Sequence, residues 1–184
     1  MTPDTLQHVH KALKKKFSTR KLIFGSGLIG SKIAFIGEHP GLDGEKEGVP
    51  LAGENSKFLN KLLRVAGLDH KKAYFTNVVK YHPKDKKPTP KEIKSYVPFL
   101  KEELKTVGPK VVVTLGDIAL TGVGLRQPLD NVHGRTFNMG SYILVPTFHP
   151  ETASKDPEVQ SLLQADLLKL KRILAEAETA EKEA

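Results

Sequence analysis

Polar side chains that could do chemistry follow three apolar runs of the sequence. The run 32–36 leads into Glu38 and His39, a later run ends on Asn77, and another ends on His149. A carboxylate or an imidazole can orient water or stabilise a developing charge, and an asparagine amide offers a donor and an acceptor that match the edge of a pyrimidine. Because the carboxyl ends of parallel strands meet at one edge of a sheet, we expect these side chains to share one site.

Apolar runs alternate with helical patterns along the chain, which is typical of parallel strands joined by crossover helices. Thr89 and Pro90 mark a firm helix start, because a capping box is combined there with proline at the first helical position. An amphipathic helix is expected over 4–17. The expected strand and helix pairs that follow are 32–36 with 56–66, 73–79 with 90–106, 110–115 with 117–123, and 141–146 with 157–177.

Length and composition indicate one globular domain. The chain has 184 residues, of which 39% are hydrophobic, and we place the domain at 1–175. Residues 176–184 are small and acidic and are predicted to form a disordered tail. No apolar run approaches the roughly 18 residues that cross a bilayer, and the amino-terminal segment lacks the apolar centre of a signal peptide. We therefore expect a soluble intracellular monomer, in the cytoplasm or nucleoid.

The charge distribution favours a partner that carries phosphates. The net charge is +8, and lysines cluster at 14–16, 71–72 and 84–87. Such a distribution is expected of a protein that binds nucleic acid, although similar runs also occur on ordinary solvated faces. The sequence has no cysteine, which excludes disulfides, iron–sulfur clusters held by thiolates and cysteine nucleophiles. Its histidines show no zinc-type spacing, so no metal is predicted.

Each candidate residue also has an ordinary structural explanation. The loop 37–41 lacks the glycine spacing of dinucleotide folds and the lysine of a phosphate loop, so it is either a turn or an active-site loop whose N–H groups face a bound group. Asn77 could cap the next turn, and His149 could be a satisfied structural group. The functional explanation gains weight because the three strand ends are expected to meet.

Taken together, the motifs resemble the uracil-DNA glycosylase superfamily, and most closely its family-four branch, the thermostable iron–sulfur type. The resemblance covers roughly residues 20–155, with the motifs in the same order. The segments that carry it are Phe24–Gly27, similar to F-G-x-G; Gly37–Gly41, to G-E-A-P-G; Gly48–Gly53, to G-R-P-F-V-G; Thr76–Lys80, to T-N-V-V-K; Pro88–Ile93, to P-T-P-x-E-I; Thr114–Gly116, to A-L-G; and Thr147–Pro150, to T-Y-H-P.

The resemblance implies a fold and a set of roles. The fold is a three-layer α/β/α arrangement with a central, mainly parallel four-stranded sheet. In the implied pocket for a flipped uracil, Asn77 reads the base edge, His149 contacts O2 and Glu38 orients the water. The predicted catalytic residues are therefore Glu38 and His149. The predicted substrate-binding residues are Gly37, His39, Pro40, Gly41, Leu51 and Asn77.

Further residues are predicted around this pocket. Asp43 and Glu45 are alternative groups for positioning the water, and lysines are expected to grip the flanking DNA phosphates. The lysines predicted for this role are Lys80, Lys84 and Lys155.

The chain departs from the branch at several positions. The branch ligates a 4Fe–4S cluster with four cysteines, whereas here the later pair falls on Tyr81 and Tyr96 and the earlier pair falls in the lysine-rich stretch 11–16. We expect no cluster and no other cofactor, and we expect the tyrosines to fill the volume by aromatic packing. Leu51 replaces the phenylalanine that stacks on uracil, and a stacked aromatic is worth ~1–3 kcal/mol per base. His39 replaces an alanine and either adds a base or narrows the pocket.

The segment after His149 and Pro150 also differs. Superfamily members often carry a leucine wedge there, but residues 151–155 contain no large apolar side chain. Extruding a base from a duplex costs a few kcal/mol, so single-stranded or loosely paired DNA is the predicted substrate.

The sequence thus predicts a monofunctional uracil-DNA glycosylase of base excision repair, which hydrolyses the N-glycosidic bond of a flipped uracil and leaves an abasic site. The alternative is a catalytically weak or inactive DNA-binding scaffold or processivity member of the same fold, which Leu51, His39 and the missing wedge favour. A hydrolase of small nucleosides or nucleotides is a third hypothesis, but such an enzyme would not need the strong positive charge of this chain.

Overall fold

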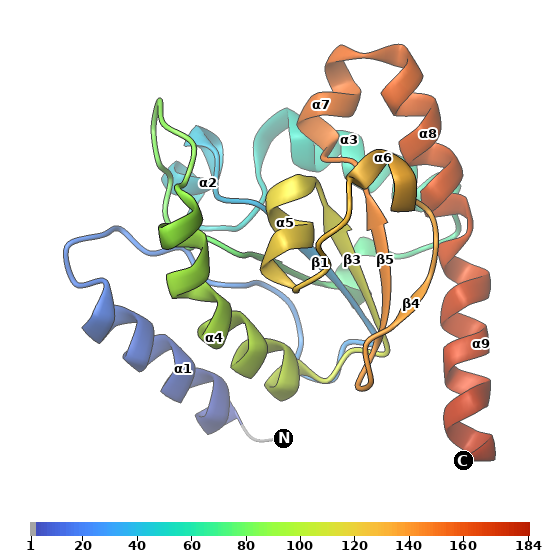
Figure 1. The fold of residues 1–184 in the computed structure, drawn as a ribbon, viewed down its shortest axis with the longest axis horizontal. Coiled ribbons are helices and arrows are strands. Elements are labelled where there is room, and N and C mark those ends of the chain that lie inside the picture. Colours follow the sequence, from blue (N-terminus) through green and yellow to red (C-terminus); the bar gives the residue numbers. More distant parts are fainter. Residues whose placement is uncertain (1–2) are drawn as a thin grey trace.

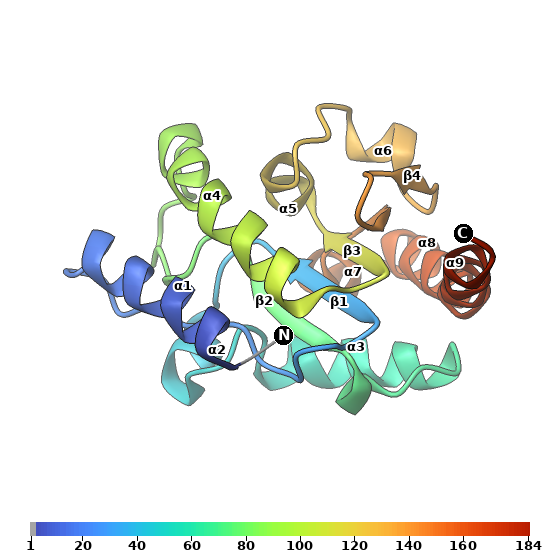
Figure 2. The same ribbon diagram turned by 90° about the horizontal axis from the view of Figure 1, so that it is seen from below.

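The protein is built in three layers, with one sheet between two sets of helices (Figures 1 and 2). The computed structural model describes residues 3–184. Residues 1 and 2, which the predicted domain 1–175 includes, lie outside the described range. The three-layer α/β/α fold expected from the resemblance is confirmed.

The sheet has four parallel strands and a short fifth strand. Its order is β2-β1-β3-β5-β4, and only β4 runs antiparallel to its neighbour. The four parallel strands match the predicted four-stranded sheet, and the two-residue β4 adds an edge that the sequence pattern does not predict. The strands are β1 (Ile33–Gly37), β2 (Tyr74–Asn77), β3 (Val111–Leu115), β4 (Phe137–Asn138) and β5 (Ile143–Thr147).

Helices cover both faces of the sheet, and each face has its own apolar core. On one face α1, α4, α5 and α6 lie over a core that includes Ile36, Tyr96 and Leu144, and on the other α3, α8 and α9 lie over a core that includes Phe35 and Leu63 (Figure 2). The helices are α1 (Pro3–Lys16), α2 (Leu42–Glu47), α3 (Gly53–Val65), the 3₁₀ helix η1 (His70–Lys72), α4 (Pro90–Val107), α5 (Asp117–Gly122), α6 (Leu129–Val132), α7 (Pro150–Lys155), α8 (Pro157–Leu168) and α9 (Leu170–Glu183).

The local signals in the sequence place these elements well. Thr89 caps α4 by accepting a hydrogen bond of 3.1 Å from the N–H of Glu92, and Pro90 occupies its first turn, as predicted. The strongly apolar strands β1 and β3 are buried along their whole length because helices cover both of their faces. The expected helix over 157–177 is divided at Lys169 into α8 and α9.

The carboxyl-terminal residues differ from the sequence-based expectation. Instead of a disordered tail, residues 176–183 continue α9 to Glu183. This last part of the helix lies along the protein, where Lys32 pairs with Glu178 at 3.0 Å and Lys110 pairs with Glu181. Two of the four glutamates that suggested disorder, Glu178 and Glu181, are the partners of the lysines that precede β1 and β3.

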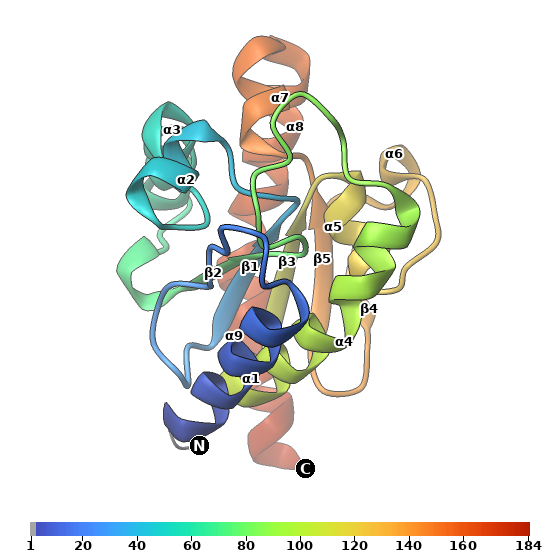
Figure 3. The same cartoon turned by 90° about the vertical axis from the view of Figure 1, so that its left-hand side faces the viewer.

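The carboxyl ends of the four parallel strands lie at one edge of the sheet, under α2, α7 and the loop that precedes α4 (Figures 1 and 3). The register places Gly37, at the end of β1, beside Asn77, at the end of β2. β3 lies between β1 and β5 in the sheet, and β5 ends two residues before His149. This topology brings the three predicted strand ends together. Within the described residues, no helix is both long and apolar enough to span a membrane.

Candidate active site

Asn77 and His149 line one small cavity at the carboxyl edge of the sheet. This inner cavity has a volume of about 10 Å³, and Gly37, Pro50 and Leu51 are among the residues around it. A cavity of this size holds about one water molecule, because a water needs roughly 10–15 Å³. Two side chains that are 72 positions apart in the chain, Asn77 and His149, therefore line the same small space, as the sequence predicts.

The amide of Asn77 is held in place on both sides. Its Nδ2 donates a hydrogen bond of 2.8 Å to the carbonyl oxygen of Pro50, and the side chain is buried. Its Oδ1 lies against Gly37, where any side chain would collide with it. Gly37 is therefore needed so that the amide can lie flat against the end of β1.

Glu38 lies beside this cavity and is bound to the start of α5. Its Oε2 accepts a hydrogen bond of 2.8 Å from the N–H of Ile118. Gly116 makes room for the carboxylate, since it adopts a φ of +98° and an added Cβ would lie 2.7 Å from Oε2. Burial raises the pKa of Glu38 above its ordinary value, and the hydrogen bond from Ile118 opposes this shift. One carboxylate oxygen is thus engaged in the fold, and Oε1 remains for other partners.

Glu38, His39 and His149 also line a larger opening of about 230 Å³, which we call the entrance hollow. Leu51 and His149 line both the entrance hollow and the inner cavity, so the two spaces meet at these side chains. A second opening of about 520 Å³, the side hollow, shares Glu38, His39 and His149 and includes Lys87. His149 thus shares one space with Asn77 and two with Glu38.

The surroundings of His149 favour a neutral ring whose Nε2 carries the proton. Its Nδ1 accepts a hydrogen bond of 3.1 Å from the N–H of Glu151, so the proton of the neutral ring lies on Nε2. Burial lowers the pKa of His149 from its ordinary value of 6.5 to about 4, although the charge of Glu151 opposes this shift. The ring can therefore donate from Nε2 at neutral pH without carrying a charge.

A pair of histidines fixes the loop between β1 and α2. The Nδ1 atoms of His39 and His82 each lie 3.0 Å from the carbonyl oxygen of Pro40. A carbonyl oxygen only accepts hydrogen bonds, so Nδ1 of each ring is the donor to Pro40. Since the ring of His39 lines both hollows, its Nε2 is available there as a second polar group.

Some of the other predicted residues line the site, whereas others lie on the surface outside it. Gly41 and Asp43 line the entrance hollow, but Glu45 is not among the residues that line the inner cavity or either hollow. Lys84 is exposed in the loop before α4, and the exposed Lys155 pairs with Glu151 at 3.3 Å. Lys84 and Lys155 can still meet a phosphate, since both are on the surface.

Lys80 lies in the core, which corrects the prediction that it contacts DNA. Its side chain is 2% exposed, and Nζ lies 2.6 Å from the carboxylate of Glu103 on α4. Nζ also donates to the hydroxyl of Thr76 at 2.6 Å and to the carbonyl oxygen of Asn77 at 2.5 Å. The other oxygen of Glu103 accepts from Thr76 at 2.8 Å and from Tyr74 at 2.7 Å. The ion pair supports the strand end that carries Asn77.

A second buried carboxylate supports the end of β5. Asp166 on α8 accepts a hydrogen bond of 2.7 Å from the hydroxyl of Thr147, two residues before His149. The same oxygen lies 2.9 Å from Nδ1 of His133, whose ring packs on Phe148. Both strand ends are thus tied to a helix by a carboxylate.

The residues at the predicted cluster positions do not fit an iron–sulfur cluster. Phe17 stacks on Tyr96 with ring centres 4.1 Å apart, Arg20 lies over Tyr81 at 4.3 Å, and the hydroxyl of Tyr81 donates to Glu92. Burial raises the pKa of both tyrosines, so neither offers a phenolate near neutral pH. With no thiolate in the sequence, aromatic packing joins α1 to α4 and to the loop after β2.

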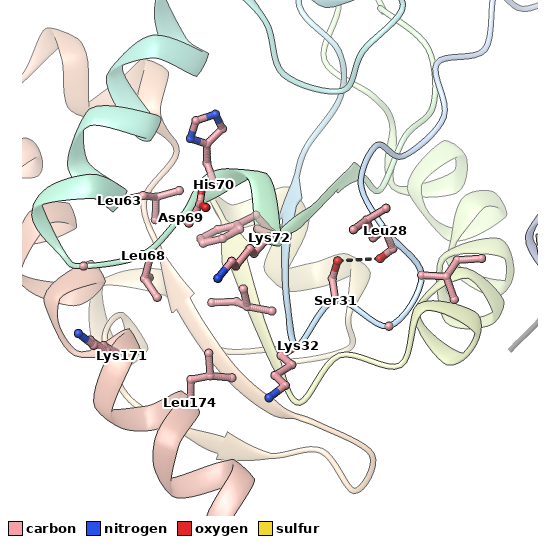
Figure 4. Close-up of a pocket in the computed structure, with 16 residues that line it drawn as sticks. Leu28, Ser31, Lys32, Leu63, Leu68, Asp69, His70, Lys72, Lys171 and Leu174 are labelled. Carbon is pink, nitrogen blue, oxygen red and sulfur yellow. Dashed lines mark hydrogen bonds between the residues drawn. The ribbon is translucent and has the colours of Figure 1, made fainter.

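Another opening lies at the opposite end of the strands from the candidate site, near the start of β1 (Figure 4). It has a volume of about 510 Å³ and a largely apolar lining that includes Leu28, Leu68 and Leu174, with Lys72 and Lys171 also lining it. Glu38, Asn77 and His149 are not among its lining residues. It is therefore separate from the candidate site.

Sequence reasoning missed the residues that support the site from behind. Glu103 lies on the apolar stripe of α4, between Leu100 and Val107, and Asp166 lies on that of α8, between Leu163 and Leu167. A charged residue within an apolar stripe is the signal that could have identified both. The carbonyl of Pro50 left no such signal, because its role depends on tertiary packing.

Fold and site together define a protein of the Uracil DNA glycosylase superfamily, whose profile matches residues 24–171. The chain belongs to this family. It is 31% identical over 159 residues to the Type-4 uracil-DNA glycosylase of Thermotoga maritima, covering 83% of each chain. It is 28% identical over 183 residues to the Type-4 uracil-DNA glycosylase of Saccharolobus solfataricus, covering 94% of this chain and 84% of the relative.

Proposed function

We propose that the protein is a uracil-DNA glycosylase that acts inside the cell in base excision repair, hydrolysing the N-glycosidic bond of a flipped uracil to leave an abasic site. The observation that carries this proposal is the inner cavity, which Asn77 and His149 line together and beside which Glu38 lies. The names of the similar Type-4 enzymes support the same substrate.

His149 stabilises the leaving group in the proposed reaction. When the bond between C1′ and N1 breaks, the sugar gains oxocarbenium character and uracil leaves as an anion with charge on O2. A neutral Nε2–H donates to that oxygen more strongly as the charge develops, which lowers the barrier. The pKa of about 4 keeps the ring neutral at physiological pH, so the donor is in its working form.

Glu38 orients the water that attacks C1′. Its Oε2 is fixed by the N–H of Ile118, which leaves Oε1 to accept a hydrogen bond from the water in the entrance hollow. His39 and Asp43 line the same hollow and are the alternative groups for this role. The reaction needs no metal or organic cofactor, because leaving-group stabilisation and water positioning come from these side chains.

Asn77 selects the base. The amide pairs with the O4 and N3–H edge of uracil, whereas cytosine presents an amine and an unprotonated N3, which would leave buried polar groups unpaired. Its Nδ2 carries two hydrogens, and the 2.8 Å hydrogen bond to Pro50 uses one of them, so the other is the proposed donor to uracil O4.

The inner cavity must widen for a base to enter. At about 10 Å³ it has room for a water but not for a pyrimidine. Pro50 and Leu51 lie between β1 and α3, in a segment without regular structure, and Leu51 separates the inner cavity from the entrance hollow. Movement of this segment would join the two spaces and release Asn77 from Pro50.

A strand-cleavage assay tests the proposal. The protein is incubated with matched single-stranded oligonucleotides that contain one uracil, thymine or cytosine, and alkali then cuts any abasic site. We expect cleavage of the uracil strand alone. Intact uracil strands at high enzyme concentration, with an established glycosylase as positive control, would contradict the proposal.

The second candidate is a DNA-binding member of the fold that does not cleave. The small volume of the inner cavity, the hydrogen bond of the Asn77 amide to Pro50 and the absence of an aromatic side chain at Leu51 favour it. A salt-dependent gel shift with uracil-containing DNA, but no abasic product, would support this candidate over the enzyme.

A further inference from the structure

We propose that Leu42 is the apolar wedge that enters the base stack and holds a flipped nucleotide out of duplex DNA. This inference rests on the proposed function, because it deepens the account of how the same site receives its base. It assigns to α2 a task that residues 151–155, in α7, have no large apolar side chain to perform.

Leu42 is exposed at the mouth of the site. Its side chain is 56% exposed and lines the entrance hollow together with Glu38, His39 and His149. The described residues include five exposed large apolar side chains, and Leu42 is the one that lines the inner cavity or a hollow of the candidate site. The five are Leu28, Leu42, Val65, Leu162 and Leu168.

The backbone below Leu42 is rigid, which a wedge requires. Pro40 is buried and its carbonyl accepts from two histidine rings. The short helix α2 closes on itself, since the N–H groups of Gly48 and Val49 both donate to the carbonyl of Gly44, at 2.8 and 3.1 Å. Gly44 itself is packed so closely that an added Cβ would lie 2.7 Å from the carbonyl oxygen of Val49. A side chain on such a platform can push against stacked bases without being displaced.

The side chains around the site lie in the order in which a flipped nucleotide would contact them. Leu42 lies at the entrance hollow, Leu51 and His149 lie where this hollow meets the inner cavity, and Lys87 lines the side hollow next to Glu38. An apolar side chain inserted between base steps occupies the space that the extruded base leaves, while a lysine beside the hollow holds a phosphate. The wedge therefore acts only when the target base begins stacked in a duplex.

Leu42→Ala tests this assignment by comparing DNA substrates. We expect uracil release from a fully paired U·A duplex to fall about tenfold or more, release from a U·G mismatch to fall less, and release from a single strand to stay within about twofold of wild type. Leu42→Met keeps a long apolar side chain and should retain duplex activity. The matched control is Leu28→Ala, a leucine that is 70% exposed at the opposite edge of the sheet (Figure 4).

A second measurement, of base stacking, distinguishes failure of the wedge proposal from failure of the proposed function. A duplex with 2-aminopurine beside the uracil becomes more fluorescent when the stack opens, whether or not the bond is cut. We expect wild type and Leu28→Ala to raise this fluorescence and Leu42→Ala to raise it much less. Equal signals from wild type and Leu42→Ala, or equal loss of activity on duplex and single strand, would overturn the proposal. Absent uracil release with every substrate would overturn the proposed function, and the fluorescence would still decide the wedge.

Discussion

The ends of β2 and β5 are supported by two buried carboxylates that differ in their contact with solvent. Behind β2, Glu103 pairs with Lys80, and both side chains are at most 3% exposed. Behind β5, Asp166 is equally buried, but its partner His133 has a side chain that is 23% exposed. The first network is closed within the core, whereas the second reaches the surface.

This difference separates two tasks of the candidate site. In the proposed reaction Asn77 presents a fixed pattern of donor and acceptor to a base, and Lys80 donates to the carbonyl oxygen of Asn77 from within the core. In the same proposal His149 donates to a group that changes its charge, and the network behind it includes a second histidine, His133. The comparison predicts that breaking the β2 network costs more than breaking the β5 network.

The largest expected loss of stability follows Lys80→Met. Removing one partner leaves Glu103 as a buried, unpaired charge, which typically costs about 3–5 kcal/mol. Urea denaturation followed by circular dichroism measures the change in the free energy of unfolding. The double variant Lys80→Met with Glu103→Gln removes both charges and should recover much of the loss, while a single-variant loss below about 1 kcal/mol would show that the pair is unimportant.

Asp166→Ala should cost less, about 1–3 kcal/mol, because it leaves the donors on Thr147 and His133 without their acceptor. The same denaturation experiment measures it, with the exposed Asp85→Ala as control. If Asp166→Ala proved more damaging than Lys80→Met, the comparison between the two strand ends would be reversed.

The protonation state of His149 provides a further test at the β5 end of the site. Its pKa is lowered from 6.5 to about 4, so between these values the unfolded chain binds a proton that the folded protein does not. By linkage, this group makes the folded state less stable as pH falls from about 6.5 towards 4. Nitrogen NMR of the imidazole should show a neutral ring protonated on Nε2 at pH 6. A charged ring at that pH would contradict the role of His149 as a neutral donor.

The smallest effect is expected at the carboxyl-terminal helix. Glu181→Gln removes a surface ion pair with Lys110, and such pairs contribute less than about 1 kcal/mol. Thermal unfolding in low and high salt measures the change, which should shrink as salt increases. A loss as large as that of Asp166→Ala would mean that the end of α9 is part of the core.

Much of the fold could be predicted because its signals are local. The capping residues Thr89 and Pro90 begin α4 where the sequence indicates, and the apolar runs become the parallel strands. The meeting of Asn77 and His149 at one edge also follows from the rule for parallel sheets. The sequence pattern predicts disorder for 176–184, whereas the structure continues α9 there, and the partners of Glu178 and Glu181 are Lys32 and Lys110, which are distant in sequence.

Other parts of the site depend on long-range packing. Lys80 looks like one more surface lysine until α4 places Glu103 against it. The engagement of Asn77 by Pro50 likewise requires a loop from another part of the chain. Aromatic packing of Tyr81 and Tyr96 at the predicted cluster positions was foreseen, but the stacked Phe17 and the overlying Arg20 were not.

The most direct test of the central claim is single-turnover release of uracil from a single-stranded oligonucleotide by wild type and Asn77→Ala. If Asn77, His149 and Glu38 form one base pocket, wild type produces abasic sites and the variant loses at least about a hundredfold in rate, the usual cost of removing one polar contact to the transition state. Circular dichroism confirms that the variant is folded. A folded variant with the wild-type rate would contradict the account.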